Sequence, residues 1–152
     1  MIAVEERDIA TAREWYVKSL AISDRLSLRY LIASNYHQLG MIAQEEGDFA
    51  TAREWYLKSI AVSEKQGDLH GAAFTYGQLG LLAGLQGSVD EAGMFLVRSI
   101  TSFSRANDQP LAQRGVENFL VLYERASAKD KRQLEAIWRE VGLGAFSAGG
   151  WR

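Results

Sequence analysis

Hydrophobic and polar positions recur along this chain with the period of an α-helix. In residues 49–66, Ala52, Tyr56 and Ile60 fall on one side of a helix, whereas Arg53 and Lys58 fall on the other. Such spacing predicts amphipathic helices that bury one face. The alternating pattern typical of β-strands is found nowhere in the sequence. The pattern therefore predicts an all-α protein.

Breaks in this pattern fall where helices are expected to end. Gly47 and Asp48 form one junction, in which glycine suits the left-handed end of one helix and aspartate caps the next. The segment Ser88–Glu91 repeats this junction as a capping box. Pro110, the only proline, is expected in the first turn of a later helix, where its missing N–H is not needed.

The sequence also repeats itself at a spacing of 40 residues. Residues 1–23 match residues 41–63 at seventeen of twenty-three positions, and residues 36–43 recur as residues 76–83. A weaker third copy begins at Ser88. A fixed period of this size indicates one supersecondary unit per repeat, which must stack on its neighbours to bury its apolar face.

The order of small and aromatic residues in each copy resembles the tetratricopeptide repeat (TPR). One copy carries this pattern as Tyr36, Leu39, Gly40, Gly47, Phe49, Ala52 and Tyr56, and the next as Tyr76, Leu79, Gly80, Gly87, Val89, Ala92 and Leu96. The resemblance implies a right-handed α-solenoid of antiparallel helix pairs, with about seven helices. The 40-residue unit is longer than the usual one, and it is similar to arrays in bacterial STAND-type signalling proteins.

These patterns predict one helical domain over residues 1–142. Its expected parts are a partial repeat at 1–26, repeats at 27–67 and 68–106, and a degenerate repeat with a cap at 107–142. Because Met1 aligns with Met41, Met1–Glu6 is expected to be the stub of a missing helix in a longer protein. Leu134, Ile137, Trp138 and Val141 are expected to form the single apolar stripe of a C-terminal capping helix, and residues 143–152 are expected to form a flexible Gly-rich tail.

Composition narrows the class of protein. The net charge is −2 without a cluster of basic residues, so binding to nucleic acid is not expected. The chain has no cysteine, which removes thiolate chemistry and is compatible with a reducing cytoplasm. The most apolar stretch, residues 72–85, falls short of the roughly 20 residues that cross a membrane. We therefore expect a cytoplasmic protein that is not bound to membranes.

No pattern of catalytic residues is present. The sequence lacks a phosphate-binding glycine loop, a zinc protease motif and a calcium loop. His37 and His70 lie on different predicted helices, so a shared metal site is not favoured, and the neighbouring Glu45 and Glu46 point about 100° apart on a helix. The expectation is a protein that is not an enzyme, with no cofactor and no metal. Trp15, Trp55 and Phe95 recur at one repeat position, where packing is favoured over ligand binding.

The TPR resemblance implies that the first helix of each pair lines a concave groove. Carried over by position, the groove would contain Ser34, His37, Gln38, Met41, Gln44, Glu45, Phe74, Gly77, Gln78, Leu81, Gly84, Leu85, Arg114, Glu117, Asn118, Val121, Glu124 and Arg125. Met41 and Leu81 stand where many relatives have asparagine, and no lysine occupies these positions, so neither an asparagine ladder nor a clamp for a C-terminal carboxylate is reproduced.

The leading hypothesis from the sequence is a non-enzymatic scaffold that binds a protein or peptide in this groove. The mixed surface favours an amphipathic helix or an apolar-anchored segment over an acidic tail. Two alternatives remain open: a sensor or regulatory fragment of a larger STAND-type NTPase, and a module that self-associates through its incomplete N-terminal end or apolar groove. Residues 72–85 are apolar all round, so a partner, a second copy or the chain's own tail is expected to cover them.

Overall fold

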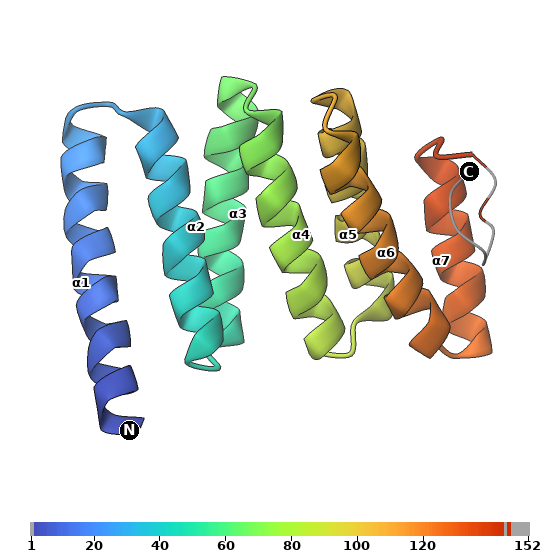
Figure 1. Cartoon of the computed structure of the whole chain (residues 1–152), viewed down its shortest axis with the longest axis horizontal. Helices are drawn as coiled ribbons and strands as arrows, with labels where there is room; N and C mark the ends of the chain where they lie inside the picture. Colours follow the sequence, from blue (N-terminus) through green and yellow to red (C-terminus); the bar gives the residue numbers. More distant parts are fainter. Residues whose placement is uncertain (1, 145, 147–152) are drawn as a thin grey trace. The chain divides into compact units, whose positions relative to one another are not determined.

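The computed structural model describes residues 2–144 and 146, and for residues 2–5 it describes the backbone alone. These residues form an all-helical fold (Figure 1). The helices, in chain order, are α1 (Ile2–Arg25), α2 (Arg29–Glu45), α3 (Phe49–Gln66), α4 (Leu69–Leu85), α5 (Val89–Arg105), α6 (Gln109–Arg125) and α7 (Ala128–Glu140). Seven helices and no strand in the described chain confirm the all-α prediction.

The chain divides into two compact units, Met1–Gly71 and Ala72–Arg152. The first contains α1, α2 and α3, and the second contains most of α4 together with α5, α6 and α7. In the first unit, α2 and α3 run antiparallel side by side, as Figure 1 shows. The single domain and the repeat boundaries expected from the sequence stay predictions. None of the described helices is long and apolar enough to cross a membrane.

Most of the predicted helix junctions form as expected. Gly47 adopts a left-handed conformation with φ +78°, and the Asp48 carboxylate accepts a hydrogen bond from the Thr51 backbone N–H. Pro110 lies in the first turn of α6. At the start of α5, however, the Ser88 side chain makes no capping hydrogen bond, so the serine half of the predicted capping box is not formed. Asp90 and Glu91 in the first turn supply favourable charge there instead.

The beginning of the chain differs from the prediction. Met1–Glu6 was expected to be the stub of a missing helix, but α1 is continuous from Ile2 to Arg25. The reason lies in one residue, because Arg7 occupies the position that Gly47 has in the next copy. A non-glycine residue disfavours the left-handed turn that ends α2 at Gly47. Helix α1 therefore continues through Arg7 without a turn.

The α2–α3 pair is held together by contacts at the TPR pattern positions. Gly40 lies against the ring of Tyr56, whose hydroxyl donates to Gln44 Oε1 over 2.9 Å. Ser59 Oγ donates to the backbone oxygen of Ala33 over 2.8 Å. Tyr56 and Ser59 are almost completely buried, so both polar groups need these partners. Packing and hydrogen bonding thus fix how α2 lies on α3.

The second unit repeats this geometry and adds a larger core. Gly80 lies against Leu96, and Ser99 Oγ donates to the backbone oxygen of Ala73 over 2.8 Å. The core cluster joins α5, α6 and α7 through Leu96, Val97, Ile100, Val116, Phe119, Leu134 and Trp138. This unit therefore buries its apolar side chains between three helices that include the last one.

Helix α7 forms where the capping helix was predicted, but fewer residues of the predicted apolar stripe are buried. Leu134 and Trp138 are buried and Ile137 is partly buried, whereas Val141 lies beyond the last helical turn and is 38% exposed. Phe146 packs against the same cluster, with its ring centroid 5.5 Å from that of Trp138. The tail predicted for residues 143–152 falls largely outside the described residues.

Candidate functional site

In the first unit, the predicted groove residues lie on the accessible side of α2. Ser34 and Glu45 are exposed, and the remaining four are partly buried, namely His37, Gln38, Met41 and Gln44. The opposite side of α2 carries the buried Ala33, Leu39 and Ala43. A partner could therefore contact these six residues without opening the helix pair.

In the second unit, α4 presents apolar groove residues to solvent. Phe74 is 50% exposed, Leu81 is 44% exposed and Leu85 is 67% exposed, although Phe74 also makes an edge contact with the ring of Phe103. Gly77 and Gln78 are partly buried, and Gly84 is exposed. The helix is apolar all round because Leu79, Leu82 and Ala83 fill the core on its other side. The exposed apolar side chains are candidate anchors for a partner.

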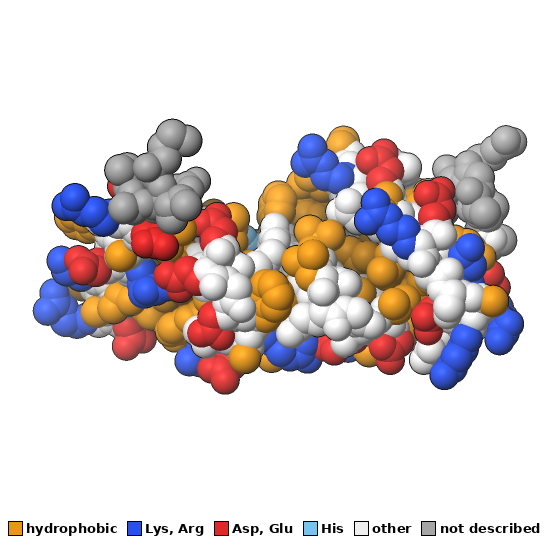
Figure 2. Space-filling view, turned by 90° about the horizontal axis from the view of Figure 1, so that it is seen from below, with side chains coloured by type: hydrophobic (Ala, Val, Ile, Leu, Met, Phe, Trp, Pro, Cys, Tyr) orange, Lys and Arg blue, Asp and Glu red, His pale blue; other side chains and the backbone are white. Residues whose placement is uncertain are grey.

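The predicted positions on α6 are all at the surface. Exposed members are Arg114, Glu117, Asn118, Val121, Glu124 and Arg125, whereas Ala112, Val116 and Phe119 are buried. Figure 2 shows one face of the molecule, on which hydrophobic side chains reach the surface between charged groups. The helical period thus places every predicted groove residue at a position that solvent reaches at least in part.

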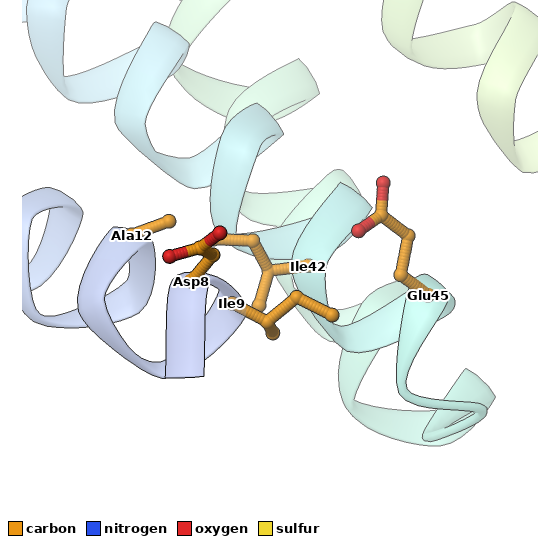
Figure 3. Close-up of a pocket in the computed structure, with 5 residues that line it drawn as sticks. All are labelled: Asp8, Ile9, Ala12, Ile42 and Glu45. Atoms are coloured by element: carbon orange, nitrogen blue, oxygen red, sulfur yellow. The ribbon is translucent and has the colours of Figure 1, made fainter. Parts of the chain in front are cut away.

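A pocket of about 600 Å³ lies between α1 and α2 in the first unit. It is lined by Asp8, Ile9, Ala12, Ile42 and Glu45. Figure 3 shows the side chains of Ile9 and Ile42 between the two carboxylates. Because Asp8 and Glu45 are exposed and Ile42 is buried, the pocket has an apolar floor with negative charge at its rim.

Sequence reasoning found only Glu45 among these pocket residues. The TPR resemblance directs attention to first helices, whereas Asp8, Ile9 and Ala12 belong to α1, which corresponds to the second helix of a repeat. The available signal was Arg7 in place of the turn glycine, since without this glycine α1 continues through the residues that correspond to the junction at Gly47 and Asp48. The continuous helix then carries Asp8 and Ile9 beside the C-terminal end of α2.

The pocket's chemistry suits a long basic side chain. The aliphatic stem of a lysine or arginine can cover apolar surface while its charged end remains near carboxylates and water. Close to the pocket, Arg13 already forms an ion pair with Glu46. The same combination of a basic group on α1 and an acidic group on α2 therefore exists within this unit.

Burial changes the pKa of His37, which belongs to the predicted groove, and of Tyr56, which lies beside it. The rings of His37 and Tyr56 lie 5.6 Å apart, and burial lowers the pKa of His37 below its ordinary value of 6.5. Burial, assisted by the negative charge of Glu45, raises the pKa of Tyr56 to about 12. Both side chains are therefore predominantly neutral at pH 7.

The aromatic positions that repeat every 40 residues have two different environments. Trp55 stacks on Tyr36 with ring centroids 5.5 Å apart, and Phe95 stacks on Tyr76 at 6.2 Å. These contacts agree with the packing role expected from the sequence. Trp15 differs, because it is 65% exposed.

No group of three or more metal-binding side chains occurs among the residues that the structure describes. His37 lies on α2 and His70 near the start of α4. The exposed apolar side chains of α4 and the carboxylate-rimmed pocket are features of a surface that binds a partner.

Comparison with known proteins identifies the class of protein. The tetratricopeptide repeat family matches residues 30–105, half of the chain, so the chain belongs to this family. Tetratricopeptide repeats generally mediate protein–protein interactions, and family members are typically non-enzymatic scaffolds.

One solved structure confirms the fold. The crystal structure of BtubC (BKLC) from P. vanneervenii matches 92% of this chain with a TM-score of 0.67 at 20% sequence identity. The chain spans 60% of the length of that protein. No curated protein sequence gives a significant match. The comparison therefore supports the helical-repeat fold and does not carry over a function.

Proposed function

We propose that this chain is a non-enzymatic scaffold that binds a helix or apolar-anchored segment of a partner protein on its first helices. The pocket between α1 and α2 receives a basic side chain of that partner. The proposal rests on the pocket, which combines an apolar floor with two exposed carboxylates. The two carboxylates attract basic partner segments and repel acidic ones.

Apolar anchoring is supported by α4. Large apolar side chains contribute most to binding when a partner removes them from water, and charged rims mainly add specificity. Leu81 and Leu85 are exposed, whereas the core of the second unit is filled by other residues. The proposal therefore gives each unit its own contribution: the apolar face of α4 in the second unit adds affinity for apolar segments, and the carboxylates of the pocket in the first unit select basic side chains.

The proposal is tested by selecting peptides from a random library on the immobilised chain. We expect the selected peptides to share a lysine or arginine next to apolar residues. Their affinity should fall about tenfold or more for the double variant Asp8→Lys/Glu45→Lys, because an exposed charge pair contributes up to about 1 kcal/mol and reversal adds repulsion. Calorimetric titration measures the change.

The matched control is Glu14→Lys/Glu54→Lys, which makes the same change in net charge at two exposed positions outside the pocket. This control should keep most of the affinity. Selected peptides without basic residues, or equal losses in both double variants, would contradict the role of the pocket.

A further inference from the structure

A second pocket, of about 280 Å³, lies in the first unit and is lined by side chains from α1, α2 and α3. It differs from the pocket described above, which is lined by α1 and α2 alone, and the two share no lining residue. Pockets for drug-sized ligands usually measure about 300–1,000 Å³. The smaller volume therefore suits a ligand of only a few atoms, such as a single amino acid.

This pocket lies on a side of α1 that differs from the side that a first helix covers in the next copy. The residues of α3 that hydrogen-bond to α2 are Tyr56 and Ser59, and their equivalents in α1 do not line the pocket. Val17 does line it and is 49% exposed. Its equivalent in α3, Leu57, is 43% exposed although α2 covers another face of α3. This side of the helix is therefore open in both copies.

The interior of the pocket is apolar and held in place by contacts within the unit. Leu39 and Ala43 of α2 are buried, and Trp55 of α3 adds an aromatic wall. The Trp55 ring stacks on Tyr36 with ring centroids 5.5 Å apart, and Lys58 Nζ lies 4.6 Å from its centre. A surface that is already formed binds an aliphatic group without the cost of ordering it first.

Opposite charges lie together at the rim of the pocket. Arg13 and Glu46 form an ion pair in which both side chains remain partly exposed, and Asp48 lines the pocket beside them. Hydrogen bonds from Thr51 hold the pKa of Asp48 below its ordinary value, and the positive charge of Arg13 acts in the same direction. A guanidinium has five N–H donors and a carboxylate has about four acceptor sites. The rim therefore offers both donors and acceptors to a ligand.

The repeat does not require these charges. The apolar wall recurs forty residues later, as Leu79, Ala83 and Phe95. Gln86 and Ser88, however, stand where this copy has Glu46 and Asp48. The left-handed turn still forms between them, with Gly87 at φ +79°. The helix junction can therefore form without either acid, and the charged rim distinguishes this copy from the next.

We propose that this pocket binds a free α-amino acid with an aliphatic side chain. Its ammonium group donates to Asp48, its carboxylate accepts from Arg13, and Glu46 holds Arg13 in position. The aliphatic side chain lies against Leu39 and Trp55. The N-terminus of a peptide lacks the carboxylate and the C-terminus lacks the ammonium, so only the free zwitterion uses both charges of the rim. This inference does not rest on the proposed function, because it concerns a different pocket and a small molecule.

Calorimetric titration of the full chain with L-leucine tests the proposal. We expect saturable binding of one ligand per chain. Leucinamide lacks the carboxylate and N-acetyl-leucine lacks the ammonium, so each should bind at least about tenfold more weakly, the usual effect of losing a hydrogen bond between charged groups. Equal affinity for leucine and either analogue would overturn the proposal, and so would the absence of binding at millimolar leucine.

Substitutions at the rim locate the site. Arg13→Gln and Asp48→Asn should each weaken leucine binding at least about tenfold for the same reason. Asparagine also caps helices well, so Asp48→Asn should keep α3, which circular dichroism verifies. The matched controls Arg25→Gln and Asp24→Asn make the same exchanges at exposed positions of α1 outside the pocket and should keep the affinity. Unchanged affinity in the folded rim variants, or equal losses in the controls, would show that leucine does not bind here.

Discussion

Single glycine residues determine how closely paired helices approach in this protein. A Cβ atom built on Gly40 would lie 2.5 Å from Tyr56 Cε1, and one built on Gly80 would lie 2.8 Å from Leu96 Cγ. Neither the Tyr56 ring nor the Leu96 side chain can move away freely, since both are almost fully buried. The sequence marks both positions, because glycine recurs directly after a leucine at the same repeat position. Any side chain there would separate the helices or strain the core.

Also at the residue scale, the lowered pKa of His37 makes stability depend on pH. Its folded pKa lies below the ordinary 6.5 because burial disfavours the charged imidazole. Below pH 6.5 the unfolded chain therefore binds a proton that the folded chain does not, so the free energy of unfolding falls as the pH decreases. Urea unfolding between pH 7.5 and 5.5 measures this decline.

The variant His37→Gln should show a flatter profile over this pH range, since it removes the group that titrates. His70→Gln changes the other histidine, which is exposed, and should keep the decline. An unchanged slope in His37→Gln would mean that other groups cause the pH dependence.

At the scale of elements, the pattern of the sequence located α2 to α7 well but was wrong about the beginning of α1. Hydrophobic periodicity specifies a helix and its buried face, whereas the end of a helix depends on single residues such as the turn glycine. Arg7 replaces that glycine, and α1 continues through this position. Residues Asp8, Ile9 and Ala12 of the pocket were missed for this reason.

Helix α4 allows its two apolar faces to be tested separately. The double variant Leu81→Asp/Leu85→Asp should change stability by no more than about 1 kcal/mol, because surface substitutions usually stay within about 0.5 kcal/mol each. Its circular dichroism should match that of the parent chain. Binding of the selected peptides should be lost, since charge replaces the exposed apolar anchors.

Leu79→Asp provides the contrasting variant, because Leu79 is 0% exposed and a buried unpaired charge is strongly destabilising. Cooperative unfolding of Leu81→Asp/Leu85→Asp would show that these leucines belong to the core. In that case the accessible face of α4 has been assigned incorrectly.

At the scale of the whole molecule, the repeat period was sufficient to predict the all-helical class and the family, and both are confirmed. Sequence periodicity could do this because each copy must bury its apolar face on a neighbour. It could not specify the pocket, which depends on how α1 and α2 meet in space. Nor could it show that Trp15, unlike Trp55 and Phe95, has no aromatic stacking partner among the residues that the structure describes.

Hydrogen–deuterium exchange of the full chain, with and without a selected basic peptide, tests the central claim most directly. The account predicts slower exchange upon peptide binding at the pocket, in residues 8–12 and 41–45, and on the accessible face of α4. The Asp8→Lys/Glu45→Lys variant should lose this protection in the pocket segments. Protection confined to α3, α5 or α7 would contradict the claim that the pocket of the first unit and the accessible face of α4 in the second unit bind partner segments.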